Sequence, residues 1–399
     1  MTDIKPIRRL AIANRGEAAM RCIRAVKSLG ALESSGIQVI ALYTDVDRAA
    51  PFVRHADVAI RLPTNGGTAV SAYLNHDLLI EKLTQAGADA VWPGWGFVSE
   101  DPKFVARVLA AGMRFLGPPP HVMQELGDKI SAKHLAERAD VPVSPWSRGV
   151  VTNESEALEH ARAIGYPLLI KASAGGGGRG IRVLRRDEDV AEAFRSAATE
   201  AKNAFGDDRL FMEKMVQGGR HIEVQIVADT HGTVVALGCR DCSVQRRHQK
   251  VLEEAPPVGL PPLMIRALKE SAAGLARQAG YIGAGTCEFL VQGADYFFLE
   301  MNPRLQVEHG ITEEITGTDL VQLQIRIARG EHLPPLDVTE RGFAIEARVC
   351  AEDPDAGFLP APGRIGRFDP AFGPRLRIDT GVAPGSSVPA DFDSLIAKV

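Results

Sequence analysis

The sequence predicts an α/β and α+β protein with an N-terminal doubly wound parallel sheet, a glycine-rich lid and an antiparallel-sheet region. Short apolar segments alternate with amphipathic ones up to about residue 117, which is typical of parallel strands joined by crossover helices. Glycines at 175–178 separate two strand-like segments, and paired apolar runs follow residue 211. A chain of 399 residues with 45% hydrophobic and 24% charged residues has room for two or three domains.

The first predicted domain covers residues 1–117. We expect strands at 8–13, 37–43, 88–93 and 114–117, and helices at 16–30, 77–87 and 102–112. Gly30 is the expected C-cap of the first helix, and Asp77 is the expected N-cap of the second. Residues 118–142 form a linker that opens with prolines and contains a helix from Asp128 to Arg138.

Residues 143–211 are expected to form a small separate lid. A helix at 155–165 precedes a strand at 167–173, and a second strand at 181–184 precedes a helix at 187–203. Gly175, Gly177 and Gly180 match the G-x-G-x-x-G spacing of dinucleotide sites, but that motif needs a helix after the glycines. The sequence therefore predicts a strand–loop–strand hairpin whose amides can face an anion, and a flexible surface loop is the alternative.

Residues 212–399 are expected to contain an antiparallel sheet, with hairpins at 220–240 and 285–302. In the second hairpin Glu288 and Glu300 are equidistant from Ala294. They should therefore face each other about 5 Å apart, which is unfavourable unless a cation lies between them or one is protonated. Asn302 adds a carbonyl oxygen, and oxygen ligands favour Mg²⁺ or Mn²⁺. The alternative is a pair of solvated glutamates at the strand ends.

Two further stretches concentrate polar and basic residues. If 302–308 is extended, its even spacing places four side chains on one side: Asn302, Arg304, Gln306 and Glu308. The stretch 241–250 is basic and contains Gln245, Arg246, Arg247, His248 and Lys250. A cationic cluster suits an anionic substrate, although a solvated charged face is the alternative.

Charge and cysteine content exclude several functional classes. The formal net charge of −4 argues against a nucleic-acid partner, and no apolar stretch has membrane-spanning length. The first residues do not have the pattern of a signal peptide, and an odd count of five cysteines indicates reduced thiols in a cytoplasmic protein. Cys239 and Cys242 form one C-x-x-C without the second pair that a zinc site needs.

The motifs, taken in order, resemble those of one family, the biotin carboxylases, which are ATP-grasp enzymes. The matching stretches span nearly the whole chain: IANRGEAAMRCIRA, GDKISAK, KASAGGGGRGIRVL, FMEKMVQGGRHIEVQIVAD, RDCSVQRRHQK, GTCEFL, EMNPRLQVEHGITEEITG and EARVCAEDP. Departures are few: Ala174 stands where the glycine run usually begins, and VWPGWGFVSE replaces the commoner HPGYGFLSE. The family's C-terminal domain continues beyond Val399, so the resemblance also implies a chain truncated within that domain.

The resemblance implies a role for each matching residue. Contacts to ATP are implied for Lys129, Lys171, Gly177, Gly178, Glu213, Lys214, Val216, His221, Gln245 and His248. Glu288, Glu300 and Asn302 match the metal ligands, in agreement with the hairpin argument. Bicarbonate is expected at Lys250, Arg304, Gln306 and Val307. Glu308 matches the general base, and Arg348 matches the group that holds biotin as its enolate.

The implied activity is an ATP-dependent ligation: carboxylation of biotin by bicarbonate through carboxyphosphate. It requires ATP, Mg²⁺ or Mn²⁺, and biotin on a carrier domain outside this chain. The expected partners are that carrier and a carboxyltransferase, with a homodimer or larger assembly and neither nucleic acid nor membrane. The alternatives are another ATP-grasp carboxylate ligase or an inactive ATP-binding module. For Arg348 the alternative is a structural ion pair with Glu346 or Glu352.

Overall fold

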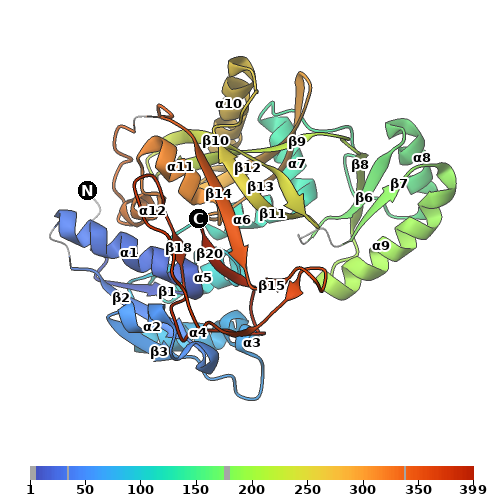
Figure 1. The fold of residues 1–399 in the computed structure, drawn as a ribbon. Helices are drawn as coiled ribbons and strands as arrows, with labels where there is room; N and C mark the ends of the chain where they lie inside the picture. The colour runs from blue at the N-terminus through green and yellow to red at the C-terminus, as the bar shows by residue number, and fades with distance from the viewer. Residues whose placement is uncertain (1–5, 34–35, 175–179, 337) are drawn as a thin grey trace.

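We describe the chain from a computed structural model, which covers residues 6–33, 36–174, 180–336 and 338–399. Figure 1 shows three regions: an N-terminal α/β unit, a lid that projects to one side, and a large sheet between them. Over the described ranges, none of the helices combines the length and apolar character needed to span a bilayer.

The N-terminal unit is the predicted doubly wound parallel sheet, with the strand order β3-β2-β1-β4-β5. Alternate residues of the central strand face opposite sides. Leu10 and Ile12 pack with the first helix, whereas Ala11 contributes to the core on the other face. The strands and flanking helices are β1 (Arg9–Ile12), α1 (Gly16–Glu33), β2 (Gln38–Tyr43), α2 (Pro51–His55), β3 (Val58–Arg61), α3 (Ala69–Leu74), α4 (His76–Gln85), β4 (Ala90–Trp92), α5 (Pro102–Ala110) and β5 (Arg114–Phe115).

Several predicted boundaries in this unit are wrong. Helix α1 continues through Gly30 to Glu33, so Gly30 is not its C-cap. Helix α4 is capped by Asn75, whose side chain accepts a hydrogen bond from the Leu78 amide, and Asp77 lies in its first turn. The linker contains two helices, α6 (Pro120–Gly127) and α7 (Lys129–Arg138), because a proline at the first turn favours helix initiation. The predicted helix began at Asp128, and in the structure Asp128 is the N-cap of α7, where its side chain accepts a hydrogen bond from the Ser131 amide.

The lid has its own small sheet and core, at the right of Figure 1. Strand β6 (Leu168–Ala172) lies between β7 (Ile181–Leu184) and β8 (Leu210–Lys214), and α8 (Glu154–Ile164) and α9 (Val190–Phe205) cover the sheet. β6 and β7 are antiparallel, which confirms the strand–loop–strand hairpin. Gly177 and Gly178, the predicted phosphate contacts, lie outside the described residues.

The large sheet has eight strands in the order β13-β12-β9-β10-β11-β14-β20-β18, paired antiparallel throughout. Both predicted hairpins are part of it. The strands are β9 (Arg220–Ala228), β10 (Val234–Arg246), β11 (Gln249–Ala255), β12 (Gly283–Gln292), β13 (Asp295–Asn302), β14 (Ala344–Cys350), β18 (Asp379–Thr380) and β20 (Leu395–Lys398).

The two faces of the large sheet differ in chemistry. The helix α10 (Pro262–Ala279) covers an apolar face to which Cys239 of β10 contributes. The next residue, Arg240, points to the opposite face and donates a hydrogen bond to Thr312 of α11 (His309–Thr316). This alternation of apolar and charged residues along β10 follows from the two-residue period of a strand. The polar face carries the candidate site.

Candidate active site

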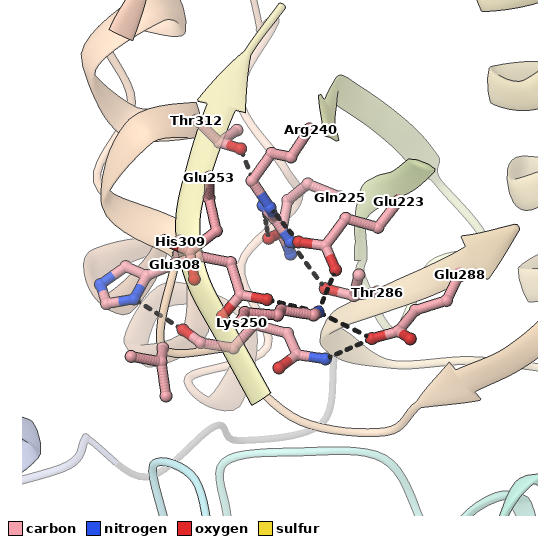
Figure 2. A network of polar contacts seen from close by, with 12 residues as sticks. Glu223, Gln225, Arg240, Lys250, Glu253, Thr286, Glu288, Glu308, His309 and Thr312 are labelled. Atoms are coloured by element: carbon pink, nitrogen blue, oxygen red, sulfur yellow. Dashed lines mark hydrogen bonds and ion pairs between the residues drawn. The ribbon is translucent and has the colours of Figure 1, made fainter. Parts of the chain in front are cut away.

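Lys250 of β11 is the centre of the polar network in Figure 2. Its ammonium lies 2.6 Å from a carboxylate oxygen of Glu223, 2.6 Å from one of Glu308 and 3.0 Å from one of Glu288. Lysine has three N–H donors, so these contacts can use all of them. Burial lowers the pKa of Lys250, but the three carboxylates outweigh it and raise that pKa above its ordinary value. Lys250 therefore remains a cation.

Arg240 supports this network from the side away from Lys250 (Figure 2). It is fully buried, pairs with the second oxygen of Glu223, and donates at 2.8 Å to Gln225 and at 2.8 Å to Thr312. Sequence reasoning missed both Arg240 and Glu223. A signal was present, because Glu223 and Gln225 alternate with the apolar residues Ile222, Val224 and Ile226 along β9. Two polar residues on one face of a buried strand require partners.

Glu288 and Glu300 occupy directly opposed positions on β12 and β13, as predicted. The pairing arises differently from the prediction. The turn is shorter, with Gln292 opposite Asp295, and a bulge next to Glu288 restores the alignment. Burial and then the charge of Glu288 raise the pKa of Glu300. Two directly opposed carboxylates, with Thr286 opposite Asn302 in the same ladder, fit a divalent cation.

Glu288 accepts hydrogen bonds from several donors. One oxygen lies 2.9 Å from the Asn302 amide nitrogen and 3.1 Å from that of Gln306, and the other lies 2.8 Å from the His221 ring nitrogen. Burial opposes ionisation of Glu288, but Lys250 and His221 hold its pKa well below the usual range. The site thus brings together a carboxylate that is ionised and one whose ionisation is disfavoured.

The condition of an extended segment does not hold, because 303–308 bends and turns between β13 and α11. The predicted grouping forms nevertheless. Arg304 donates at 3.0 Å to Gln306 and pairs at 3.0 Å with Glu100, another residue that sequence reasoning missed. The Val307 carbonyl accepts a 2.6 Å hydrogen bond from Lys398. The turn places Glu308 directly against Lys250.

Glu308 is fully buried and lies between two cations. Its second oxygen accepts a 2.9 Å hydrogen bond from Arg348, which also donates at 2.7 Å to Glu253. Burial opposes ionisation of Glu308, yet Lys250 and Arg348 hold its pKa well below the ordinary value. The alternative prediction for Arg348 was a structural ion pair with Glu346 or Glu352. The ion-pair partners are instead Glu253 and Glu308, so this prediction was wrong about the partners.

A second cluster lies at the base of the lid. Glu213 of β8 pairs with Lys171 of β6 and, at 2.6 Å, with Lys133 of α7, which the sequence did not single out. Burial raises the pKa of Glu213, but these two lysines lower it to about 2. Burial lowers the pKa of Lys129, which begins α7. The charges of Lys129 and Lys171 both favour ionisation of Glu300, so this cluster adjoins the carboxylate pair.

Three predicted nucleotide contacts lie outside both networks. Lys214 donates to the carbonyl oxygens of Gly165 and Tyr166 at the end of α8, at 2.9 and 2.8 Å. Val216 packs beside Gly219, and His248 occupies the exposed β10–β11 turn with a φ of 64°. Gln245 does reach the first network, because its amide nitrogen lies 3.2 Å from the His221 ring.

Three family models together match most of the chain. Residues 6–123 match the biotin carboxylase N-terminal domain, 128–336 match the ATP-binding domain of the carbamoyl-phosphate synthase L chain, and 346–399 match the biotin carboxylase C-terminal domain. The fold and the site thus define an ATP-grasp ligase.

Relatives identify the family. The human mitochondrial propionyl-CoA carboxylase alpha chain is 44% identical over 99% of this chain and 54% of its own length, and pyruvate carboxylase 1 of Caenorhabditis elegans is 46% identical over 99% and 34%. The chain belongs to the biotin carboxylase family, as predicted, and is an ATP-dependent biotin carboxylase domain. It spans about half the length of the first of these relatives.

Solved structures match the whole chain. Biotin carboxylase from Campylobacter jejuni in a beta-gamma-ATP complex gives a TM-score of 0.93 at 40% identity, covering 100% of this chain and 87% of that one. The biotin carboxylase domain dimer of Hydrogenobacter thermophilus 2-oxoglutarate carboxylase, with MgADP, ADP and bicarbonate, gives 0.93 at 40% identity, covering 99% and 86%. These matches confirm the predicted fold class.

Proposed function

We propose that this chain uses ATP and bicarbonate to carboxylate N1′ of biotin on a carrier domain, through carboxyphosphate, with the residue roles given below. The observation that carries the proposal is the position of the Lys250 ammonium, which pairs with Glu223, Glu288 and Glu308. Arg348 contacts Glu308 from the other side. A different carboxylate ligase has no need for a buried base held between these two cations.

In the first half-reaction Glu308 is the general base. It is ionised and buried, so it can take the bicarbonate proton without competition from bulk water. Lys250, Arg304, Gln306 and the backbone at Val307 are the proposed bicarbonate contacts. Bicarbonate is a weak nucleophile, and alignment together with neutralisation of charge on the γ-phosphoryl group lowers the barrier.

For ATP we propose phosphate contacts from Lys129 and Lys171 and metal ligation by Glu288, Glu300 and Asn302. A bound Mg²⁺ or Mn²⁺ would neutralise phosphate charge there. The C. jejuni structure in a beta-gamma-ATP complex and the H. thermophilus complex with MgADP support this nucleotide and Mg²⁺. Gly177, Gly178, Glu213, Lys214, Val216, His221, Gln245 and His248 remain proposed nucleotide contacts.

In the second half-reaction Arg348 stabilises the enolate oxygen of biotin as N1′ loses its proton. The carrier domain and a carboxyltransferase are the proposed partners, and the acyl or keto acceptor depends on that carboxyltransferase. A homodimer is proposed because the H. thermophilus relative is a biotin carboxylase domain dimer. A cytoplasmic location suits the five free thiols, although the human relative is named as mitochondrial.

The test is an ATP-cleavage assay with and without bicarbonate, together with ¹⁴C-bicarbonate transfer to biotin. We expect ATP cleavage to require bicarbonate and Mg²⁺ or Mn²⁺, and label to reach biotin. Arg348→Ala should abolish transfer to biotin and spare much of the bicarbonate-dependent cleavage, whereas Glu308→Gln should depress both. Cleavage that another carboxylic acid accelerates in place of bicarbonate would favour a different ligase, and no cleavage would favour an ATP-binding module.

A further inference from the structure

Two buried glutamates lie behind Arg348. Glu253 of β11 and Glu346 of β14 are directly opposite each other in the antiparallel ladder, and only 1% and 4% of their surfaces are exposed. Opposed residues in such a ladder have their Cβ atoms about 5 Å apart, and like charges there destabilise the sheet. Within the described residues, one oxygen of each carboxylate has no hydrogen-bond partner. Neither property suits two ionised carboxylates.

Glu253 holds the Arg348 side chain in one orientation. Arg348 donates from Nε to Glu253 at 2.7 Å and from Nη2 to Glu308 at 2.9 Å. The guanidinium is a rigid planar group, so fixing one N–H direction fixes the others. Glu253 therefore sets the direction in which Arg348 presents its charge to Glu308 and to the space beside it (Figure 2 shows Glu253 next to Glu308).

The surrounding charges leave this pair short of positive partners. The titratable groups that act on it come from several elements: Arg348 on β14, Lys398 on β20, Glu308 before α11, and Glu223 on β9. Lys398 is shared with Glu17 of α1 and Asp379 of β18. Burial, reinforced by neighbouring carboxylates and opposed by Arg348 and Lys398, raises the pKa of Glu253 to about 7 and that of Glu346 to about 8.

We propose that Glu253 is the positioning residue for Arg348 and that Glu253 and Glu346 hold one proton between them at neutral pH. The proposal rests on the proposed role of Arg348 in the biotin half-reaction. With one proton on the pair, Arg348 faces Glu308 and at most one further charge, and its positive field remains available to the developing enolate oxygen. Loss of that proton adds a second negative charge where negative charge must develop, which opposes enolate formation.

Four variants separate positioning from ionisation. Glu253→Gln keeps an oxygen that can accept from Arg348 and imitates the protonated acid, whereas Glu253→Leu removes the acceptor. Glu346→Gln removes the shared titration without touching Arg348. Glu254→Gln is the matched control, because Glu254 is the next residue of β11 and lies 4.0 Å from the Arg220 guanidinium.

The measurements are kcat/KM for biotin carboxylation and the rate of bicarbonate-dependent ATP cleavage, from pH 6 to pH 9.5. We expect Glu253→Leu to lose roughly tenfold to a hundredfold in carboxylation relative to ATP cleavage, the range for one charge-assisted hydrogen bond. Glu253→Gln should keep the wild-type ratio at pH 7. For wild type we expect the ratio of carboxylation to ATP cleavage to decline above about pH 8, and both Gln variants should lose this decline.

A ratio for Glu253→Leu equal to that of Glu254→Gln would overturn the positioning role. If Glu253→Leu does not fold, a ratio for Glu253→Gln at pH 7 no higher than that of Arg348→Ala would overturn it instead. Unchanged alkaline profiles in both Gln variants would overturn the shared proton. Infrared spectroscopy at pH 7 provides a readout without turnover: wild type should show a buried carboxylic acid C=O band that Glu346→Gln weakens, and its absence would overturn the shared proton. Failure of the proposed function gives a different result, namely wild type that transfers no label to biotin.

Discussion

Replacing Lys250 with methionine tests whether one ammonium holds the site together. Lys250 contacts three carboxylates, and two of them, Glu223 and Glu308, are fully buried. Removing one partner of a buried ion pair costs about 3–5 kcal/mol. We expect one such cost rather than three, because Glu223 keeps Arg240 and Glu308 keeps Arg348. For a chain of 399 residues the melting temperature falls by about 1 °C per kcal/mol, so it should decrease by roughly 5 °C.

The loss should depend on pH. In the wild type, Lys250 is the largest of the factors that lower the pKa of Glu308 against the opposing effect of burial. A carboxyl group with a lowered folded-state pKa contributes stability that is present above its unfolded pKa, about 4.5, and is lost as the pH falls through the folded value. Without Lys250 the carboxylates of the folded state bind protons more readily. The deficit of the variant should therefore be complete between about pH 5 and pH 8, and it should shrink as the pH falls below about 4.5.

The assay is thermal unfolding of wild type and Lys250→Met at pH 4, 6 and 8. Bicarbonate-dependent ATP cleavage is measured at a temperature where both proteins remain folded. Lys269→Met is the control, because Lys269 pairs at 2.5 Å with a single carboxylate, Glu340, on the α10 side of the sheet. It should cost far less and show no strong pH dependence. A Lys250→Met protein that loses ATP cleavage but unfolds like wild type at every pH would refute this account of Lys250.

The remaining predictions concern the carboxylate pair and the lid. Glu300→Gln should weaken metal-dependent ATP cleavage at least tenfold. Its melting temperature in EDTA should stay the same or rise, because the substitution removes a negative charge that Glu288 disfavours. A clear fall in that melting temperature would assign Glu300 a structural role. Glu288→Gln should lose a similar activity but also lower that melting temperature, because Glu288 accepts from Lys250 and Asn302. Gly180→Val should raise the KM for ATP several-fold, since Gly180 has a φ of 70° and a Cβ there would lie 3.0 Å from that of Ala172. Gly206→Ala is the control, because Gly206 has a φ of 72° but open space around it. Equal ATP kinetics in the two variants would refute the lid prediction.

The sequence predicted the framework well where hydrophobic period decides the structure. The parallel strands at 9–12, 38–43 and 90–92 and the two antiparallel hairpins form as expected. Helix boundaries were less predictable. A glycine can end a helix but does not have to, and α1 continues through Gly30 to Glu33. The region 51–74 was missed because its elements, α2, β3 and α3, are each only four to six residues long. Such short segments contain too few positions for a period to emerge.

The site was predicted in part for a similar reason. Glu288 and Glu300 were found because a hairpin relates them through local counting. Contacts that depend on strand order were not: Arg348 reaches Glu253 across 95 residues, and Glu223 meets Lys250 across 27, only because β14, β11 and β9 belong to one sheet. Arg240 was not found because it stands alone between Cys239 and Asp241, just before the basic stretch 241–250, and nothing in the sequence there indicates that it is fully buried.

The three ion pairs of Lys250 affect the order in which the substrates should bind. Lys250 has three N–H donors, and three carboxylates already surround it. A bicarbonate ion that approaches Lys250 must therefore take the place of one of these carboxylates. Glu288 is the one to yield, because its 3.0 Å contact is the longest. It also has other partners, namely the Asn302 and Gln306 amides as donors and an ion pair with His221. If Glu288 turned to hold a divalent cation, one Lys250 N–H would become free to bind an anion. Occupation of the nucleotide site should thus create the bicarbonate site, and bicarbonate should bind poorly before it.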